Sequence, residues 1–157
     1  MKPTEPLNSP EVLIIEEVTE DQEALSDIFE CSGFRVLFPP DSDPARYFVH
    51  RPVDLLVLNL HYKNLDPYPL IALSRKKKIP CIVVSRSFHQ EEARTACQLG
   101  AKMVWDLPLD RVGFRSAVQK YFPQAGAPSR TILIIDDVAE TRSYFAQTLS
   151  GENFSVL

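Results

Sequence analysis

Five short apolar segments alternate with segments of helical spacing, and this alternation constrains the fold more than any other feature of the sequence. The apolar segments are four to seven residues long, as buried strands of a parallel sheet are. They are Val12–Ile15, Phe34–Leu37, Asp54–Leu60, Cys81–Ser85 and Lys102–Asp106. Helical spacing marks Glu20–Glu30 and Gln90–Leu99, and an aspartate suited to an N-cap opens a fifth helix over Asp110–Tyr121. Since right-handed crossovers cover both faces of such a sheet, the sequence predicts an α/β fold with a doubly wound, five-stranded parallel sheet.

The last part of the chain repeats the first. Thr131–Leu157 aligns with Glu11–Leu37 at an offset of 120 residues without a gap, so that strand, acidic pair, helix and second strand fall in phase. Short β-α-β units resemble one another by chance, but the offset is the size of one small α/β domain and favours duplication. We therefore expect a complete domain over residues 11–121, a linker over 122–130, and the first β-α-β unit of a truncated second copy over 131–157. The apolar strand at the end of the chain indicates a piece of a longer tandem protein.

Composition and charge disfavour several classes of protein. The net charge of −4 and the pI of about 5.4 give no general attraction to nucleic acid. Cys31, Cys81 and Cys97 are odd in number and form no C-x-x-C pair, which indicates reduced, mostly structural thiols rather than disulfides or a zinc site. The N-terminus has no apolar signal region, and the longest apolar runs are much shorter than the roughly 20 residues that cross a bilayer. We expect a cytoplasmic protein that binds neither nucleic acid nor membrane.

Polar residues stand at the predicted carboxyl ends of the strands, where the functional crevice of an open α/β sheet lies. Those ends carry Glu16-Glu17, Asn59, Ser85 and Asp106-Leu107-Pro108. The surrounding stretches IIEEVTED, DLLVLNLHYKN, IPCIVVSRS and GAKMVWDLPL resemble, in this order, the four signature stretches of the receiver domains of response regulators. The resemblance covers about residues 11–121. It implies a flavodoxin-like, receiver-type sheet with the strand order 2-1-3-4-5.

The resemblance also implies a reaction. In receiver domains an aspartate at the end of the third strand attacks the phosphohistidine of a sensor kinase. An acidic pair after the first strand holds Mg²⁺ together with that aspartate, while a hydroxyl after the fourth strand and a lysine before a proline contact the phosphoryl oxygens. The matching positions here hold Glu16 and Glu17, Asn59, Ser85 and Leu107. Glu16 and Ser85 keep the pattern, whereas Asn59 and Leu107 break it.

The changes at Asn59 and Leu107 remove chemistry that phosphoryl transfer needs. An amide is neutral and its nitrogen lone pair is delocalised, so Asn59 cannot become an acyl phosphate. Leu107 removes the cation that would pair with the acceptor and the phosphoryl group. Glu17 carries its carboxylate one methylene further out than aspartate would, which leaves a weak candidate cation site at Glu16 and Glu17. We expect a non-phosphorylatable pseudo-receiver without a cofactor, which acts as a regulatory or protein-interaction module and not as an enzyme.

The second copy differs from the first at the acidic pair. Asp136-Asp137 restore the pair expected of a phosphorylatable receiver, but the matching acceptor strand lies beyond Leu157. The alternative function is therefore a phosphoaccepting response regulator whose active aspartate, with Mg²⁺, lies in an intact second domain. The opposing alternative is that both copies are degenerate. A flavodoxin-like cofactor binder is disfavoured because Glu16-Glu17 would repel a phosphate.

Several other polar residues have structural explanations. Three histidines lack the spacing of metal ligands and are expected at the surface: His50, His61 and His89. The cations of Arg75–Lys78 match the negative end of the third helix dipole. Asp54 is expected at the start of its strand, and Asp66 before Pro67 as the cap of the third helix, so neither is a substitute acceptor.

The expected partners are proteins. Receiver domains usually contact them through the face that here comprises Phe88–Leu99, Trp105 and the fifth helix. We expect a sensor kinase, a phosphotransfer protein or a downstream output domain to bind there, and a dimer could form through this face or through the truncated repeat. The aromatic residue that switches rotamer in receivers corresponds to Val104, with Trp105 one residue later, so the usual switch is not expected.

Overall fold

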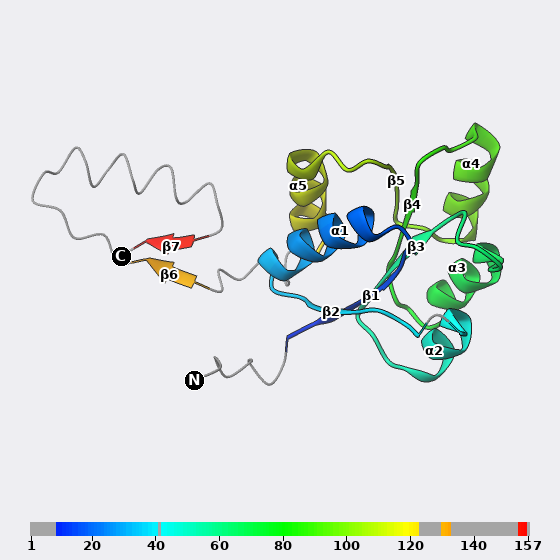
Figure 1. Cartoon of the computed structure of the whole chain (residues 1–157), viewed down its shortest axis with the longest axis horizontal. Helices are drawn as coiled ribbons and strands as arrows, with labels where there is room; N and C mark the ends of the chain where they lie inside the picture. The colour runs from blue at the N-terminus through cyan, green and yellow to red at the C-terminus, as the bar shows by residue number, and fades with distance from the viewer. Residues whose placement is uncertain (1–8, 41, 123–129, 133–153, 157) are drawn as a thin grey trace, which may run out of the picture.

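The computed structural model describes residues 9–40, 42–122, 130–132 and 154–156. The first two of these ranges build a parallel sheet with helices on both sides (Figure 1). Its strands are β1 (Glu11–Ile15), β2 (Arg35–Leu37), β3 (Leu55–Asn59), β4 (Cys81–Ser85) and β5 (Met103–Asp106). Their order, β2-β1-β3-β4-β5, confirms the predicted doubly wound sheet of the flavodoxin-like, receiver type.

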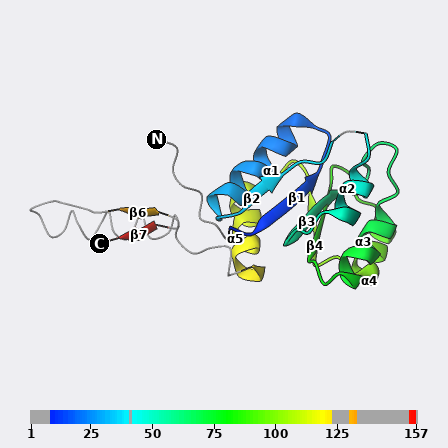
Figure 2. The same ribbon diagram turned by 90° about the horizontal axis from the view of Figure 1, so that it is seen from below.

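The helices of the described residues lie in two layers. They are α1 (Thr19–Cys31), α2 (Pro44–His50), α3 (Pro67–Lys76), α4 (Gln90–Leu99) and α5 (Arg111–Tyr121). Figures 1 and 2 together show α1 and α5 on one face of the sheet and α2, α3 and α4 on the other. Right-handed crossovers between parallel strands produce this arrangement, and it leaves the carboxyl ends of the strands at one open edge.

Strands β3 and β4 are buried along their whole length because both faces of the sheet are covered. Parallel strands in this position consist of continuous apolar residues, as LLVLN and CIVVS largely do. β3 begins at Leu55 rather than Asp54, whose carboxylate accepts the backbone N–H of Glu11 at 2.7 Å and so ties the start of β3 to β1. The strand predicted over Asp54–Leu60 was therefore one residue too long at each end.

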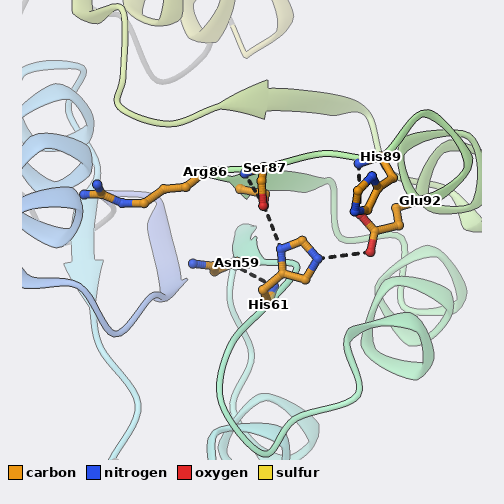
Figure 3. Close-up of a pocket in the computed structure, with 7 residues that line it drawn as sticks. Asn59, His61, Arg86, Ser87, His89 and Glu92 are labelled. Carbon is orange, nitrogen blue, oxygen red and sulfur yellow. Dashed lines mark hydrogen bonds and ion pairs between the residues drawn. The ribbon is translucent and has the colours of Figure 1, made fainter.

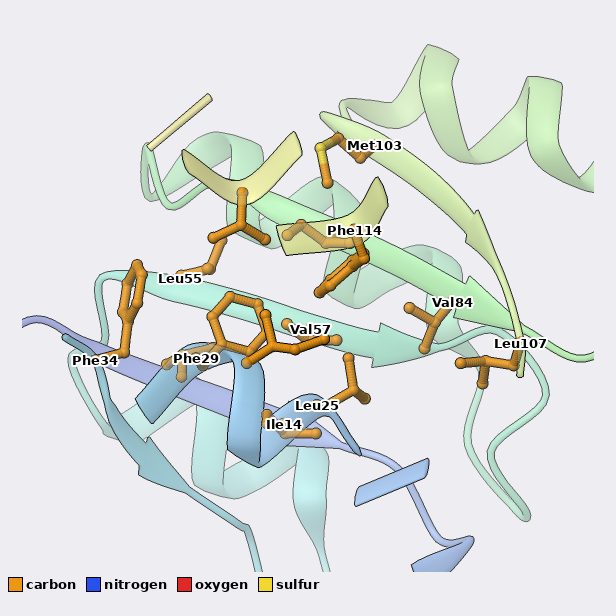
Figure 4. Packing of buried hydrophobic residues seen from close by; sticks show 14 residues of the cluster. Ile14, Leu25, Phe29, Phe34, Leu55, Val57, Val84, Met103, Leu107 and Phe114 are labelled. Carbon is orange, nitrogen blue, oxygen red and sulfur yellow. The ribbon is translucent and has the colours of Figure 1, made fainter. Parts of the chain in front are cut away.

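A row of aromatic rings packs among aliphatic side chains in the core under α1 and α5 (Figure 4). Phe29 of α1 meets Phe34 and Phe114 edge to face, with ring centroids 5.4 and 5.8 Å apart. Trp105 continues the row against Phe114 at 5.3 Å. Edge-to-face pairs add favourable electrostatics to the burial of large apolar area. Trp105 is therefore held in the packing on this side of the sheet.

A second core lies under α2, α3 and α4, where Phe48, Ile71 and Ala96 are fully buried. Asp66 caps α3 as predicted, because its carboxylate accepts the backbone N–H of Tyr68 at 3.2 Å. At the other end of α3, the ammonium of Lys77 donates to the carbonyls that end α2. The cations at the end of α3 thus stabilise the C-terminus of α2, and they also lie at the negative end of the α3 dipole, where positive charge is favourable.

A separate pair of strands lies in the last part of the chain. β6 (Arg130–Ile132) and β7 (Phe154–Val156) pair in parallel, with Thr131 opposite Ser155. In the main sheet β1 and β2 also pair in parallel, with Glu11 opposite Arg35. Thr131 and Ser155 stand 120 residues after Glu11 and Arg35, respectively. The two pairs therefore share one register, which is the register that the sequence repeat requires.

The cysteines differ in their surroundings. Cys81 is buried in β4, and burial raises the pKa of its thiol to about 12, so it is an unreactive structural thiol at neutral pH. Cys31 and Cys97 are free and exposed, so of the three thiols only Cys81 lies in the core. In the described ranges, no helix is both long and apolar enough to cross a membrane.

Candidate functional site

The site forms where β1, β3 and β4 end at the same edge of the sheet. The amide Nδ2 of Asn59 donates to Glu16 Oε2 at 2.8 Å, and both side chains are buried. The Oδ1 of Asn59 accepts the backbone N–H of His61 at 2.8 Å, and the ring Nδ1 of His61 lies 2.8 Å from Ser85 Oγ. Glu16, Asn59 and Ser85, which were singled out in the sequence, therefore belong to one chain of contacts, with His61 between Asn59 and Ser85. Figure 3 shows the contact between Asn59 and His61.

Both oxygens of the Glu16 carboxylate accept hydrogen bonds from the chain itself. Its Oε1 accepts the backbone N–H groups of Glu17 and Val18, at 2.8 and 3.0 Å, in the turn that follows β1. Its Oε2 accepts from Asn59. Three N–H groups therefore stabilise this buried charge, which would otherwise be costly to remove from water.

The residues present do not fit a magnesium ion. Mg²⁺ needs oxygen ligands in near-octahedral geometry, but Asn59 directs an N–H group at Glu16 where a second carboxylate would have to stand. Glu17 is exposed and accepts the backbone N–H of Lys63 at 3.3 Å. No group of three or more His, Cys, Asp or Glu residues with metal-binding geometry occurs in the described part of the chain. The donor set therefore gives no support to a cation site at Glu16 and Glu17.

His61 joins the loop after β3 to helix α4. Its Nε2 lies 3.0 Å from Oε1 of Glu92, and the other oxygen of Glu92 accepts the backbone N–H of His89 at 3.0 Å. Because a carboxylate only accepts, Nε2 is the donor of the bond to Glu92. A surface histidine was expected at this position. The ring is indeed partly exposed, but nothing in the sequence indicated that it bridges two elements.

The order Ser85, His61, Glu92 is that of a nucleophile, a base and an orienting carboxylate. Ser85 is nevertheless completely buried, and its Oγ also accepts the backbone N–H of Ser87 at 3.2 Å. A nucleophile must reach its substrate, and this hydroxyl is enclosed and already bonded on two sides. The arrangement therefore fixes the position of the loop and of α4, and it does not present a reactive group.

Changing His61 to alanine should raise the pKa of Glu92. That pKa lies below its ordinary value of 4.5, first because the carboxylate accepts the backbone N–H of His89 and second because it bonds His61. With a lowered folded-state pKa, these contacts add stability above pH 4.5 and lose it as the pH falls through the lowered pKa. In His61→Ala the second cause is gone, so NMR titration of the Glu92 carboxyl should show protonation at higher pH. His50→Ala is the matched control, and an unchanged titration in His61→Ala would contradict the assigned contact.

The position of the expected lysine is apolar. Leu107 is buried and packs in the core under α1 and α5 (Figure 4). A cation on the acidic side of the site is instead supplied by Arg86, whose Nε donates to the buried Asp21 at 2.9 Å. The pKa of Arg86 is raised, chiefly by this bond to Asp21, with smaller effects of Glu20 and Glu16. Arg86 thus supplies a positive charge from the end of β4, which sequence analysis did not foresee.

A polar pocket of about 280 Å³ opens beside these residues (Figure 3). Its lining consists of Asn59, His61, Ser85, Arg86, Ser87, His89 and Glu92. His89, which was expected only at the surface, also lines it. The polar groups of this wall already bond one another, so the lining of the pocket is preformed.

Other residues from the sequence analysis lie elsewhere. Val104 packs on the face of the sheet covered by α2, α3 and α4, while Trp105 packs on the opposite face against Phe114. Asp54 lies at the far end of β3 from Asn59, as expected. Asp136 and Asp137 lie outside the described residues, so their acidic pair stays a prediction.

Comparison with known proteins finds similarity only in structure. No family model and no curated protein matches the sequence. A response regulator from Thermotoga maritima superposes with a TM-score of 0.64 at 19% identity, over 74% of this chain and 99% of the other. The receiver domain of a sensor histidine kinase from Pseudomonas aeruginosa, with a magnesium ion coordinated in its active-site cleft, gives 0.60 at 19% identity, over 73% and 98%. A signal receiver domain of a histidine kinase from Syntrophus aciditrophicus gives 0.62 at 21% identity, over 74% and 92%.

These identities are low, so the matches establish the fold and not the activity. The fold is that of receiver domains, which in these proteins belong to response regulators and sensor kinases. The matched structures are covered almost completely by about three quarters of this chain. This covered share of the chain is close in size to the five-stranded unit, which runs from β1 to α5.

Proposed function

We propose that the five-stranded unit is a pseudo-receiver of two-component or phosphorelay signalling in the cytoplasm, which binds other proteins and accepts no phosphoryl group. The observation that carries this proposal is the hydrogen bond from Asn59 Nδ2 to Glu16 Oε2 at 2.8 Å. At the position where a receiver domain carries a nucleophilic carboxylate, this chain carries an amide that donates a hydrogen bond. The same amide N–H is bonded to Glu16 Oε2, the carboxylate oxygen that a cation would need.

Two further features support a regulatory or docking role without catalysis. Leu107 offers no charge to a phosphoryl group, and Ser85 Oγ is already bonded to Nδ1 of His61. These contacts link the loops around the site to one another without a ligand. The partners that fit such a module are a sensor kinase, a phosphotransfer protein or an output domain, bound through α4, β5 and α5.

Incubation with acetyl phosphate and Mg²⁺ tests the proposal. We expect intact-mass spectrometry to show no added phosphoryl group, because no carboxylate stands at the end of β3. A receiver domain with an acceptor aspartate, treated in parallel, serves as the positive control. A base-labile phosphoryl adduct mapped to residues 11–121 would refute the proposal.

A second candidate function is a tandem response regulator that accepts phosphate through its second receiver. The shared register of β6–β7 and β1–β2 favours it, together with the Asp136-Asp137 pair in the sequence. In this arrangement the first receiver regulates or docks while the second binds Mg²⁺ and reacts. A parent chain with a complete second domain should then incorporate phosphate outside residues 11–121. Failure to do so with a competent kinase would remove this candidate.

A further inference from the structure

A second pocket is formed by α2 and the loop that precedes it. Its volume of about 410 Å³ lies within the range of about 300–1,000 Å³ that is typical of sites for small molecules. Among the described residues, it shares no lining side chain with the pocket beside Asn59, so it is a separate cavity. The loop contributes Ser42 and Asp43, and α2 with the residue after it contributes Arg46, Tyr47, His50 and Arg51.

Positive charge predominates in the described lining of this pocket. Arg46 and Arg51 are cations, whereas Asp43 is the one acidic side chain that the described lining contains. Asp43 already caps α2, because its Oδ1 accepts the backbone N–H of Arg46 at 2.9 Å. The chain as a whole carries a net charge of −4, so this positive surface is a local feature. It favours an anionic ligand over a neutral or cationic one.

The two guanidinium groups keep donors that the described chain does not use. No described residue forms a hydrogen bond or an ion pair with the side chain of Arg46. The Nη2 of Arg51 lies 3.4 Å from Oε1 of Glu11, an oxygen that also pairs with Arg35. One carboxylate therefore serves two guanidinium groups, and the Nε of Arg51 is buried without a partner in the described chain. The positive charge of both lining arginines is thus incompletely neutralised.

Apolar surface accompanies these donors. The ring of Tyr47 is partly buried, and the guanidinium carbon of Arg51 lies 6.0 Å from the ring centroid. Pro40, in the loop before α2, adds a rigid apolar ring to the lining. His50 is exposed one helical turn after Arg46, where an imidazole can also donate to an anion. A few polar donors beside apolar walls are the usual composition of a small-molecule site.

We propose that this pocket binds a small organic phosphate, whose phosphate group is held by Arg46, His50 and Arg51. Arginine binds phosphate oxygens through paired, charge-assisted hydrogen bonds. A phosphate presents three oxygens in a tetrahedral arrangement, so donors from several side chains can reach it, whereas the two oxygens of a carboxylate accept in one plane. A bare anion would leave most of the cavity unfilled, so the ligand should carry an organic group that packs on Tyr47 and Pro40.

This binding is non-covalent and does not involve Asn59, so it goes beyond the proposed function. The phosphorylation test detects a covalent adduct by the mass of the denatured chain. A molecule held only by ion pairs and packing is lost in that measurement. The two tests can therefore fail independently.

Amide NMR titration of the whole chain in phosphate-free buffer tests the proposal with phenyl phosphate, inorganic phosphate and benzoate. Phenyl phosphate should give saturable shifts at Arg46, Tyr47, His50 and Arg51 at millimolar concentration. Inorganic phosphate should bind at the same residues about tenfold more weakly, because it lacks a ring to pack on Tyr47. Benzoate keeps the ring but carries a planar group of lower charge, so it should also bind about tenfold more weakly.

Three variants show whether the guanidinium group of Arg46 holds the phosphate. Arg46→Gln should weaken the binding of phenyl phosphate about tenfold, because it removes a charge-assisted hydrogen bond. Arg46→Lys keeps the charge but loses the planar pair of donors, so its loss should be smaller. Arg94→Gln on α4 is the matched control, because it removes the same charge from a side chain that is 59% exposed, and it should bind like the wild type.

Each other outcome overturns the proposal. The absence of saturable shifts with phenyl phosphate at high millimolar concentration would do so. Benzoate or inorganic phosphate that binds as tightly as phenyl phosphate would exclude an organic phosphate as the ligand class. Equal weakening in Arg46→Gln and Arg94→Gln would show general attraction by charge and no site. Shifts at Asn59 and Ser85 in place of the α2 residues would assign the binding to the other pocket.

Discussion

Replacing Asn59 by aspartate should make the stability of this domain depend on a divalent cation. Asn59 and Glu16 are 8% and 3% exposed and bond at 2.8 Å. Aspartate removes the donor and places a second carboxylate at that position, which should cost about 3 kcal/mol without a counter-ion. A cation bound between the carboxylates would return about 2.7 kcal/mol at a concentration of about 100 Kd.

Urea unfolding, followed by the fluorescence of Trp105, measures this effect. Trp105 is the only tryptophan of the chain and packs in the core of the five-stranded unit. We expect Asn59→Asp to unfold early in a chelator and to recover with millimolar Mg²⁺ or Ca²⁺, while the wild type responds to neither. Asn64→Asp is the matched control at an exposed loop position with φ of 59°, which aspartate also adopts. An Asn59→Asp variant as stable as the wild type in chelator would contradict the assigned role of the amide.

Phe29→Ala should cause the largest loss of stability among single changes in the core. The ring is completely buried and contacts both Phe34 and Phe114 edge to face. Its removal leaves a cavity between α1, α5 and the sheet, for which a loss of about 4 kcal/mol is typical. That is a large share of the roughly 5–15 kcal/mol that stabilises an ordinary domain.

The same fluorescence assay compares Phe29→Ala with Phe38→Ala. Phe38 is 43% exposed, so its truncation should cost less than about 1 kcal/mol. Equal losses in the two variants would show that the aromatic row is not the centre of the core.

The sheet could be predicted because its signals are local. Cys81–Ser85 and Gln90–Leu99 have the predicted bounds, since an apolar run and a helical spacing mark them without reference to other parts of the chain. Glu16, Asn59 and Ser85 could be placed together because parallel strands end at one edge. Strand ends were less certain, as the limits of β3 show, because the end of a strand depends on pairing with its neighbours and not on the local pattern alone.

The contacts within the site could not be predicted because they depend on loop conformation. His61 has no spacing that marks it, yet the loop after β3 places its ring between Ser85 and Glu92, which are distant in sequence. Arg86 likewise meets Asp21 only because β4 ends beside the start of α1. The sequence showed which reactive groups were missing, but the structure was needed to show what replaces them.

The central claim is that the site is closed by its own side chains. Titration with Mg²⁺ and beryllofluoride, followed by the amide NMR signals of Glu16, Asn59, His61 and Ser85, tests it most directly. We predict no saturable shift at millimolar ligand, because Asn59 and His61 already bond the groups that would hold a phosphoryl mimic. Saturable shifts at these four residues would contradict the account and show that the pocket still binds one.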